Sequence, residues 1–483
     1  MSKLNNNVNI SPALPIQAHF ILSKSSIITK ILALLRQISK CNMDSILILG
    51  AGRSATSLIN YLIGKAPEHG WSVTVADLDE SLAKEKAGDN SFSKGLALDI
   101  SDSDKRKSLV KRHRVVISML PPHLHVVIAH DCLEFGCHLL TASYLSEEIA
   151  DLHTRVSAKK LLFLFEMGLD PGIDHMSAMA LKEKIEQRGG EVFGFHSSTG
   201  GLISRRSDTN PWHYKVTWNP RNVVLAGQGT AVFKEDGQIK FLPYHQLFEN
   251  FRMIEMVNGE QYEMYPNRDS IRYCDLYNLR DVKTLIRGTL RHPEFCSGWA
   301  GLVRLGLTDD QLAIAGEAFD SYRSLLLAFL PSGNQPVEEK IYQRLGKKDA
   351  SVARQILWLF DDSPIEIPRQ RTMAQHLQDL IVRKWKLQAA DRDLVVMHHR
   401  FDYTRDGKKW RTISTLSQEG LSSSDTAMTR LVGLPLAIST ELILTNKLTL
   451  EGVQIPVRRE IYEPVLARLE ELGVHFEEET SAF

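Results

Sequence analysis

Residues 45–55 read SILILGAGRSA, and this stretch decides the fold of the first part of the chain. Residues 45–49 predict a buried strand, and apolar residues then recur at helical spacing, namely Leu58, Ile59, Leu62 and Ile63. Between them, Gly50 permits a tight turn, Gly52 lets the backbone approach a diphosphate, and Ala55 lets helix and strand pack closely. Because a helix N-terminus attracts anions, the turn predicts dinucleotide binding; the alternative is an ordinary structural glycine turn.

The expected cofactor depends on Asp77, which ends the next apolar run. A carboxylate there accepts hydrogen bonds from a ribose 2′-hydroxyl and repels a 2′-phosphate, so we predict NAD, with NADP possible. The alternative is that Asp77 only caps the turn that follows it. Asp99, at the end of the third expected strand, either contacts the adenosine or caps the next helix. The predicted cofactor-binding residues are Gly50, Gly52, Arg53, Ser54, Ala55, Asp77, Asp99, Ile100 and Ser118.

Short apolar runs alternate with helical or polar stretches through the first part of the chain, at residues 73–76, 95–100, 115–120, 138–142 and 161–165. This alternation predicts an α/β fold with a Rossmann doubly wound parallel sheet. A helix is expected from about residue 173 to 187. The pattern then changes to strands of a second, mixed sheet, at residues 191–197, 214–218, 223–225, 230–234 and 239–242.

The remaining patterns complete a division into five parts. Residues 1–43 form an N-terminal extension, 44–167 the Rossmann dinucleotide-binding domain and 168–307 an α/β substrate domain. Helical periodicity marks residues 308–392 as a helical subdomain, a helical insertion in the α/β part. Residues 393–483 return to the two α/β domains, beginning with expected strands at 393–400 and 409–416.

The extension has two interpretations. Residues 1–43 contain five Lys and Arg residues and no Asp or Glu, a bias that organellar targeting peptides share. The other interpretation, which we favour, is that Met43 is the real start of the protein. A cytoplasmic location is then expected, and an organellar matrix if the extension is a targeting segment.

The overall composition excludes several classes of protein. Lys plus Arg total 58 and Asp plus Glu total 58, so no global field favours nucleic acid or an anionic membrane. The longest apolar run we find, residues 325–330, is far shorter than the ~18 residues of a transmembrane helix. The five cysteines show no C-x-x-C spacing, so neither a disulfide framework nor a metal site is expected.

A polar turn follows the strand expected at residues 161–165. Residues 166–175 read EMGLDPGIDH and place several carboxylates and a histidine in a stiff turn. Asp170 or Asp174 could cap the helix that follows, and His175 could be a buried helix residue with satisfied hydrogen bonds. The residues alone leave this structural interpretation and a functional one equally open.

Residues 168–175, GLDPGIDH, closely resemble a segment of the saccharopine dehydrogenase family, in particular its glutamate-forming members, the saccharopine reductases. Other stretches resemble the same family, at residues 141–144, 210–218, 265–270, 287–291, 395–400, 432–435 and 455–457. The resemblance covers about residues 45–470. It implies a Rossmann domain, an α/β domain that also dimerises, and a helical insertion.

The reaction that the resemblance implies is the interconversion of saccharopine with glutamate and 2-aminoadipate 6-semialdehyde in lysine metabolism. Saccharopine carries three carboxylates, and arginine binds carboxylates in a bidentate way that lysine cannot match. By motif match, the implied substrate contacts are Ser143, Tyr144, Asp170, Arg268, Thr289 and Arg291. For each arginine the alternative is a salt bridge between domains.

The catalytic base is left open by the sequence. Asp170 and Tyr144 are the catalytic candidates, His175 and His125 are further ones, and a bound water with any of them serves equally well. The partners expected are the small-molecule substrate and a second copy of the chain in a homodimer, without nucleic acid or membrane.

One loop departs from the family pattern. Where the family has an acidic, proline-containing segment, LPAPE, residues 202–206 read LISRR. If Arg205 and Arg206 face the pocket, the substrate could be another carboxylate-bearing amine or imine conjugate; if they face solvent, the change is neutral. A non-catalytic dinucleotide-binding sensor is the remaining alternative.

Overall fold

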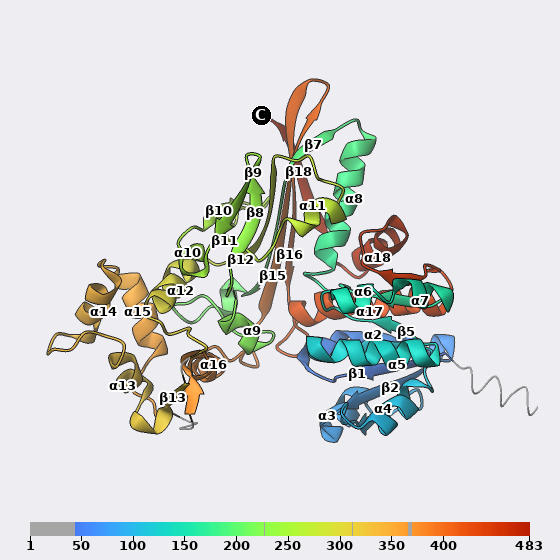
Figure 1. Cartoon of the computed structure of the whole chain (residues 1–483), viewed down its shortest axis with the longest axis horizontal. Coiled ribbons are helices and arrows are strands. Elements are labelled where there is room, and N and C mark those ends of the chain that lie inside the picture. Colours follow the sequence, from blue (N-terminus) through green and yellow to red (C-terminus); the bar gives the residue numbers. More distant parts are fainter. Residues whose placement is uncertain (1–43, 227, 312, 366–369) are drawn as a thin grey trace, which may run out of the picture.

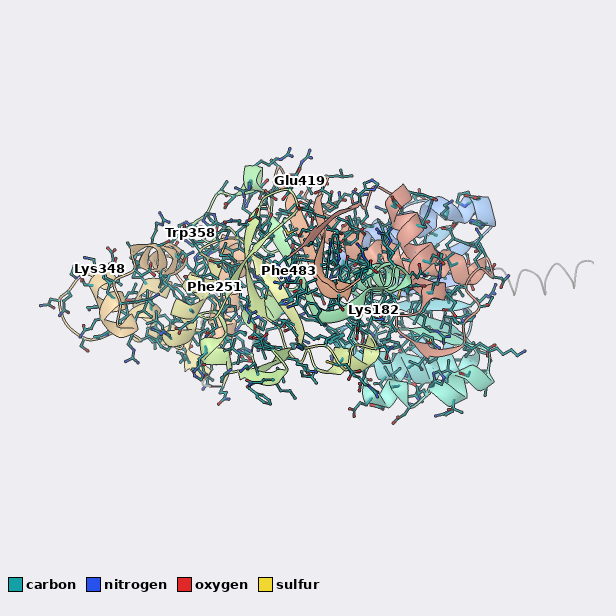
Figure 2. All side chains as sticks on the ribbon, turned by 90° about the horizontal axis from the view of Figure 1, so that it is seen from above. Lys182, Phe251, Lys348, Trp358, Glu419 and Phe483 are labelled. Atoms are coloured by element: carbon teal, nitrogen blue, oxygen red, sulfur yellow. The ribbon has the colours of Figure 1, made fainter. Side chains whose placement is uncertain are left out.

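The computed structural model describes residues 44–226, 228–311, 313–365 and 370–483. The predicted N-terminal extension, residues 1–43, lies outside the described residues. Figure 1 shows a Rossmann domain at one end, a helical subdomain at the other, and a tall twisted sheet between them. Seen from above, Lys348 and Trp358 mark the helical end (Figure 2).

The Rossmann sheet has seven parallel strands in the order β17-β6-β5-β4-β1-β2-β3. They are β1 (Ser45–Leu49), β2 (Ser72–Asp77), β3 (Ser93–Ala97), β4 (Val115–Ser118), β5 (His138–Leu140), β6 (Leu162–Leu164) and β17 (Gly452–Gln454). Because β1 lies between β2 and β4, the strand order reverses there, and this is where open α/β sheets bind ligands. The predicted α/β Rossmann fold is confirmed.

The apolar run of β1 is continuous because both faces of the sheet are covered. Ile46 and Ile48 contribute to the core under α2 (Thr56–His69) and α17 (Ala427–Leu444), while Leu47 and Leu49 contribute to the core on the other face, which includes α5 (His125–Phe135). The remaining helices of this part are α3 (Glu80–Ala87), α4 (Ser103–Val110), α6 (Glu147–Ala150) and α7 (His153–Ala158).

Helix α17 is an exception to the prediction that no segment is long and apolar enough to cross a membrane. It has 18 residues and is long and apolar enough to cross a membrane, although Arg430 and Glu441 interrupt its apolar run. The fold buries 83% of this segment. Gly433 lets α17 approach α2, since a Cβ added at Gly433 would lie 2.8 Å from the Leu58 amide nitrogen. Packing against the Rossmann core accounts for its composition.

The second sheet is mixed and has nine strands, of which seven follow the order β10-β11-β12-β7-β15-β16-β18, while β8 pairs with β12 and β9 pairs with β8. Strands β12 and β7 pair in parallel, and the other pairs are antiparallel. The strands are β7 (Glu191–Ile203), β8 (Ala231–Glu235), β9 (Gln238–Leu242), β10 (Arg252–Glu255), β11 (Gln261–Pro266), β12 (Thr284–Arg291), β15 (Asp393–Arg405), β16 (Lys408–Glu419) and β18 (Phe476–Ala482).

Two of the predicted mixed-sheet strands are wrong. Residues 223–225 overlap a short helix, α9 (Pro220–Val224), which Asn219 caps by accepting a hydrogen bond from the Arg221 amide. An asparagine followed by proline is a helix start, so the β-branched residues of α9 misled the prediction. Residues 214–218 form no strand and make one isolated bridge, between Val216 and Lys386.

The helical subdomain packs around tryptophans Trp212, Trp299 and Trp385, which are almost fully buried. Its helices are α12 (Phe295–Arg304), α13 (Tyr322–Leu327), α14 (Val337–Leu345), α15 (Ala350–Leu359) and α16 (Met373–Lys384), with a small sheet of β13 (Ala313–Ala315) and β14 (Gln370–Thr372). Helices α8 (Ile173–Gln187) and α11 (Arg272–Leu276) pack near the large sheet, and α10 (Tyr244–Leu247) contacts α12. Helix α18 (Arg459–Glu471) packs on α8 and α17, so the last segment of the chain contacts both α/β domains.

Candidate active site

The glycine turn after β1 has the geometry that a dinucleotide requires. Gly50 has a φ of 99°, which favours glycine, and a Cβ there would lie 3.0 Å from the Met119 carbonyl oxygen. Gly52 is exposed and has open space beside it, since no heavy atom lies within 4 Å of an added Cβ. A diphosphate can therefore approach the backbone at Gly52.

The helix that follows leaves its N-terminus open. The short 3-10 helix Arg53–Ala55 leads into α2, and no side chain of the described residues caps either start. Arg53 is exposed and Ser54 is half-buried beside these amides. An uncapped helix start presents free N–H groups to an anion, so the residues present fit a dinucleotide diphosphate.

Asp77 ties the glycine turn to the end of β2. Its Oδ2 accepts a hydrogen bond from the Ala51 amide at 2.7 Å, and its Oδ1 accepts one from the Asp79 amide at 3.0 Å. The turn-capping role that the sequence left as the alternative is therefore present. The negative charge nevertheless lies beside the glycine turn, where it bears on the cofactor choice.

The other predicted cofactor residues lie at the ends of strands. Asp99 caps no helix: its Oδ1 accepts hydrogen bonds from the amide and hydroxyl of Ser101, which lower the pKa of Asp99, and Asp102 is the N-cap of α4. The Ile100 carbonyl accepts a hydrogen bond from Arg106. Ser118 is fully buried, and its hydroxyl forms a hydrogen bond with His125 Nδ1.

A charged cluster joins the Rossmann side to the mixed sheet. A single nitrogen of Arg287 lies 2.7 Å from Asp170 Oδ1 and 2.5 Å from Asp174 Oδ2. Burial raises the pKa of Asp170, and the charge of Asp174 adds to the rise while Arg287 opposes it. The Asp170 side chain is 18% exposed and that of Asp174 is fully buried, so Asp170 is the carboxyl that a substrate can reach.

Tyr144 lies between this cluster and two more arginines. Its hydroxyl is 3.4 Å from Asp170 Oδ1, and the Arg268 and Arg272 guanidinium carbons lie 5.7 and 5.1 Å from its ring centroid. Burial and the charge of Asp170 raise the pKa of Tyr144 well above its ordinary value. Tyr144 is therefore a proton donor at neutral pH and does not serve as the base.

Arg291 is a buried cation surrounded by aromatic rings. Its side chain is 3% exposed, and its guanidinium carbon lies 5.3, 5.8 and 5.2 Å from the ring centroids of Tyr214, Tyr265 and Phe295. It donates to the Leu290 carbonyl and to the Tyr265 hydroxyl, while its Nε has no partner. Within the described part of the chain, no carboxylate lies at salt-bridge distance from Arg291. A substrate carboxylate would supply the missing counter-charge.

The cations occupy one face of β12. Arg287, Thr289 and Arg291 alternate along the strand, so their side chains share a face. Thr289 lies opposite Tyr265 on β11 and Thr199 on β7. Exposed Arg268 follows β11 and likewise has no carboxylate at salt-bridge distance among the described residues.

Two histidines named as possible bases are held differently. His175 is fully buried, and its ring nitrogens lie 2.8 Å from Glu166 Oε2 and 2.5 Å from the Tyr277 hydroxyl. Because both nitrogens are occupied inside the core, His175 has the structural role that the sequence left open. His125 bridges two hydroxyls, with Nδ1 2.9 Å from Ser118 Oγ and Nε2 2.7 Å from Ser143 Oγ.

The two arginines that depart from the family pattern point to solvent. Arg205 pairs with Glu260 and Arg206 with Glu419, and the side chains are 70% and 64% exposed. These salt bridges neutralise the charges of both arginines at the surface. Arg205 and Arg206 therefore give no reason to expect a different substrate.

Sequence reasoning missed Arg287, the residue that holds Asp170. The signal was present, because Arg287 and Arg291 are four residues apart within one motif and a strand places both on one face. The Ser118–His125–Ser143 contacts carry no such signal, since the three residues come from separate segments.

The comparisons with known proteins cover nearly all of the described chain. Residues 46–164 match the family description "Saccharopine dehydrogenase NADP binding domain", and residues 168–474 match "Saccharopine dehydrogenase C-terminal domain". A Schizosaccharomyces pombe protein named saccharopine dehydrogenase [NADP(+), L-glutamate-forming] is 30% identical over 90% of this chain and 99% of its own length. These descriptions favour NADP, and the prediction of NAD as the main cofactor finds no support in them.

A longer relative and a solved structure agree with this match. The Arabidopsis thaliana alpha-aminoadipic semialdehyde synthase is 31% identical over 89% of this chain, which spans 44% of that protein. The apo structure of saccharopine dehydrogenase (L-Glu forming) from Saccharomyces cerevisiae superposes with a TM-score of 0.82 at 28% identity, covering 91% of this chain and 100% of the other.

Proposed function

The chain belongs to the saccharopine dehydrogenase family, and from this premise we propose how its residues carry out the family's reaction. It is an NAD(P)-dependent oxidoreductase that acts on a CH–NH bond, the glutamate-forming saccharopine dehydrogenase of lysine metabolism. We propose which residues bind the substrate, which group accepts the proton, which cofactor is preferred and how the protein assembles.

The observation that carries the substrate assignment is the unpaired charge of Arg291. Burying a guanidinium without a counter-ion is costly, so such a group persists where a ligand completes it. Saccharopine, with carboxylates at both ends, fits a site that offers Arg291 at one end and Arg268 beside Tyr144 at the other. The aromatic rings around Arg291 lower the local dielectric and strengthen its pairing with a carboxylate.

The reaction consumes one water and releases one proton. The glycine turn and the uncapped start of α2 would hold the dinucleotide diphosphate, and the bound cofactor would supply the acceptor for a hydride from the carbon attached to the secondary amine nitrogen. The substrate nitrogen must first be neutral, so a proton leaves it. Water then adds to the resulting carbon–nitrogen double bond, and the carbon–nitrogen bond breaks to give glutamate and the semialdehyde.

We assign the proton acceptor to Asp170. Among the four candidates it is the carboxyl that remains reachable, whereas His175 is sealed in the core and Tyr144 holds its proton. The raised pKa of Asp170 brings this carboxyl closer to the range where it exchanges protons near neutral pH. Arg287 holds the carboxyl in place by donating a hydrogen bond to Asp170 Oδ1.

For the cofactor we propose that Asp77 shifts this chain toward NAD, in contrast to the relatives named for NADP(+). The argument is electrostatic: the carboxylate is fixed at the glycine turn by the Ala51 and Asp79 amides and cannot turn away from a 2′-phosphate. The expected ratio of kcat/KM for NAD over NADP exceeds one.

Asp77→Asn tests the cofactor proposal, because asparagine keeps an acceptor for the Ala51 amide while removing the charge. We expect kcat/KM with NADP to rise about tenfold, because the corresponding ~1.4 kcal/mol lies between the repulsion of two unit charges about 4 Å apart in water, about 1 kcal/mol, and near a protein surface, about 4 kcal/mol. Wild-type protein that prefers NADP, or an Asp77→Asn variant with an unchanged ratio, would contradict the proposal.

The reaction itself is tested by a matrix of substrates and cofactors on the purified protein. Saccharopine with NAD or NADP is expected to give absorbance of the reduced nicotinamide, with glutamate and the semialdehyde as products. Related amine conjugates that lack one carboxylate are expected to have raised KM values. Absence of reduction with both cofactors would refute the proposed reaction.

We also propose that the protein is a homodimer, which rests on the family resemblance and is measurable by sedimentation equilibrium. The cytoplasmic location stays a prediction.

A further inference from the structure

Ser118, His125 and Ser143 form a hydrogen-bonded chain through the Rossmann domain. Ser118 ends β4 and is fully buried, His125 begins α5 and is 2% exposed, and Ser143 is half-buried in the loop after β5. The ring of His125 connects the two hydroxyls through distances of 2.9 and 2.7 Å. These two hydrogen bonds thus connect the buried core to Ser143, the residue beside Tyr144.

The ring of His125 is neutral at physiological pH. Burial lowers the pKa of His125 to about 4, with a minor contribution from the charge of His123. A neutral imidazole donates a hydrogen bond from one nitrogen and accepts one at the other. One serine must therefore donate to the ring and the other must accept from it.

Burial decides which serine donates. In the described structure the Ser118 hydroxyl has no hydrogen-bond partner except His125 Nδ1. If Nδ1 carried the proton, the Ser118 O–H group would be buried with no acceptor, which costs about 1–3 kcal/mol. Ser118 therefore donates to Nδ1, Nε2 carries the ring proton, and Nε2–H donates to Ser143 Oγ.

From this order we propose that the buried chain fixes the Ser143 hydroxyl as a hydrogen-bond donor to a carboxylate oxygen of the substrate. With its oxygen accepting from Nε2–H, Ser143 has its own proton free for the half-exposed side. A substrate ammonium would use only the remaining lone pair of Ser143 Oγ and leave the hydroxyl proton without an acceptor, so a carboxylate is the better partner. His125 acts through Ser143 and is a positioning residue.

This inference rests on the proposed function and adds the polarity of one substrate contact. It also gives the two residues different roles, because Ser143 donates to a substrate carboxylate whereas Asp170 would accept a proton from the substrate amine. The site then offers donors at Ser143, Arg268 and Arg291 and an acceptor at Asp170.

The kinetic test compares two substitutions at His125. In His125→Gln the side-chain amide can still donate to Ser143, whereas in His125→Leu nothing does. We expect KM for saccharopine to rise about tenfold in His125→Leu and less than about threefold in His125→Gln, with kcat and the dinucleotide Kd nearly unchanged. Equal KM values in both variants would overturn the proposal.

A double-mutant cycle removes the effect of mere destabilisation. Ser143→Ala is expected to raise KM as much as His125→Leu, and the double variant to raise it no further, because both changes remove one contact. His113→Leu is the matched control: His113 is also buried, lies in the same domain and bridges the Leu109 carbonyl and the Thr74 hydroxyl. It is expected to lower Tm without changing KM; additive effects of the other two changes would contradict the proposal.

A second measurement does not depend on activity. Nitrogen-15 NMR of labelled histidines, with the His125 signals assigned by their loss in His125→Gln, reports which ring nitrogen carries the proton. We expect Nε2–H at neutral pH, and the Nδ1–H form would overturn the inference even in an active enzyme. Protein that shows Nε2–H but does not oxidise saccharopine would instead refute the proposed function.

Discussion

Arg287 and Arg291 share one face of β12 and yet have opposite electrostatic surroundings. Arg287 contacts two carboxylates, those of Asp170 and Asp174, while Arg291 contacts rings and a backbone carbonyl. The first arginine neutralises charge that the fold has buried. The second is itself a buried charge that awaits neutralisation, and this difference separates a structural cation from a binding one.

Methionine substitutions at the two arginines are expected to give opposite results. Arg287→Met leaves two buried carboxylates without a cation and should lower the free energy of unfolding by about 3–5 kcal/mol. Arg291→Met removes an unpaired buried charge, so stability should hold or rise, while KM for saccharopine should increase about 10- to 100-fold. Chemical denaturation and steady-state kinetics on the same preparations check both. A destabilised Arg291→Met variant with unchanged KM would show that Arg291 is structural.

At the scale of single elements, the sequence predicted those whose cause is local. The glycine turn, β1 and α2 follow from periodicity and turn chemistry, and the structure has them where they were expected. Strands β10, β11 and β12 were not predicted, because charged or polar residues interrupt the apolar pattern of each strand. Arg291 on β12 is an example: nothing local indicates that aromatic side chains from residues 214 and 295 will surround it.

The start of α17 depends on one buried carboxyl, which gives a pH-dependent prediction. Asp393 accepts hydrogen bonds from the Ala427 and Met428 amides, and burial raises the pKa of Asp393 to about 6. The folded state then holds this proton more tightly than the unfolded state. The resulting stabilisation is full below about pH 4 and disappears as pH rises through about 6.

Asp393→Asn removes this titration. The difference in unfolding free energy between wild type and variant should shrink by about 2–3 kcal/mol between pH 4 and pH 7, measured by urea titration at each pH. Asp349→Asn serves as the control, since Asp349 caps α15 from a half-exposed position. A difference that stays constant with pH would contradict the role of Asp393.

At the scale of the whole molecule, the C-terminal segment holds the two α/β domains together. Asp393 of the mixed sheet accepts hydrogen bonds from the first amides of helix α17, and this helix packs against α2, which follows the glycine turn. Strand β17 then joins the Rossmann sheet beside β6, and β18 joins the mixed sheet beside β16. Ser143 and Tyr144 of the site belong to the Rossmann domain, whereas Asp170 and the arginines belong to the second α/β domain, so their spacing depends on this segment.

Close packing of α17 on α2 should therefore matter for cofactor binding. Gly433→Leu would place a side chain where a Cβ already lies 2.8 Å from the Leu58 amide nitrogen and 3.2 Å from its Cβ, so the helices must separate. Because the N-terminus of α2 belongs to the proposed diphosphate site, we expect the dinucleotide Kd to rise about tenfold, together with a loss of about 2–3 kcal/mol in stability. Gly64→Ala on α2 is the matched control, since an added Cβ there meets nothing within 4 Å and alanine favours helices. Nicotinamide fluorescence titrations measure the Kd values, and a Gly433→Leu variant that binds the dinucleotide like wild type would show that α17 stabilises the fold without setting the position of the glycine turn.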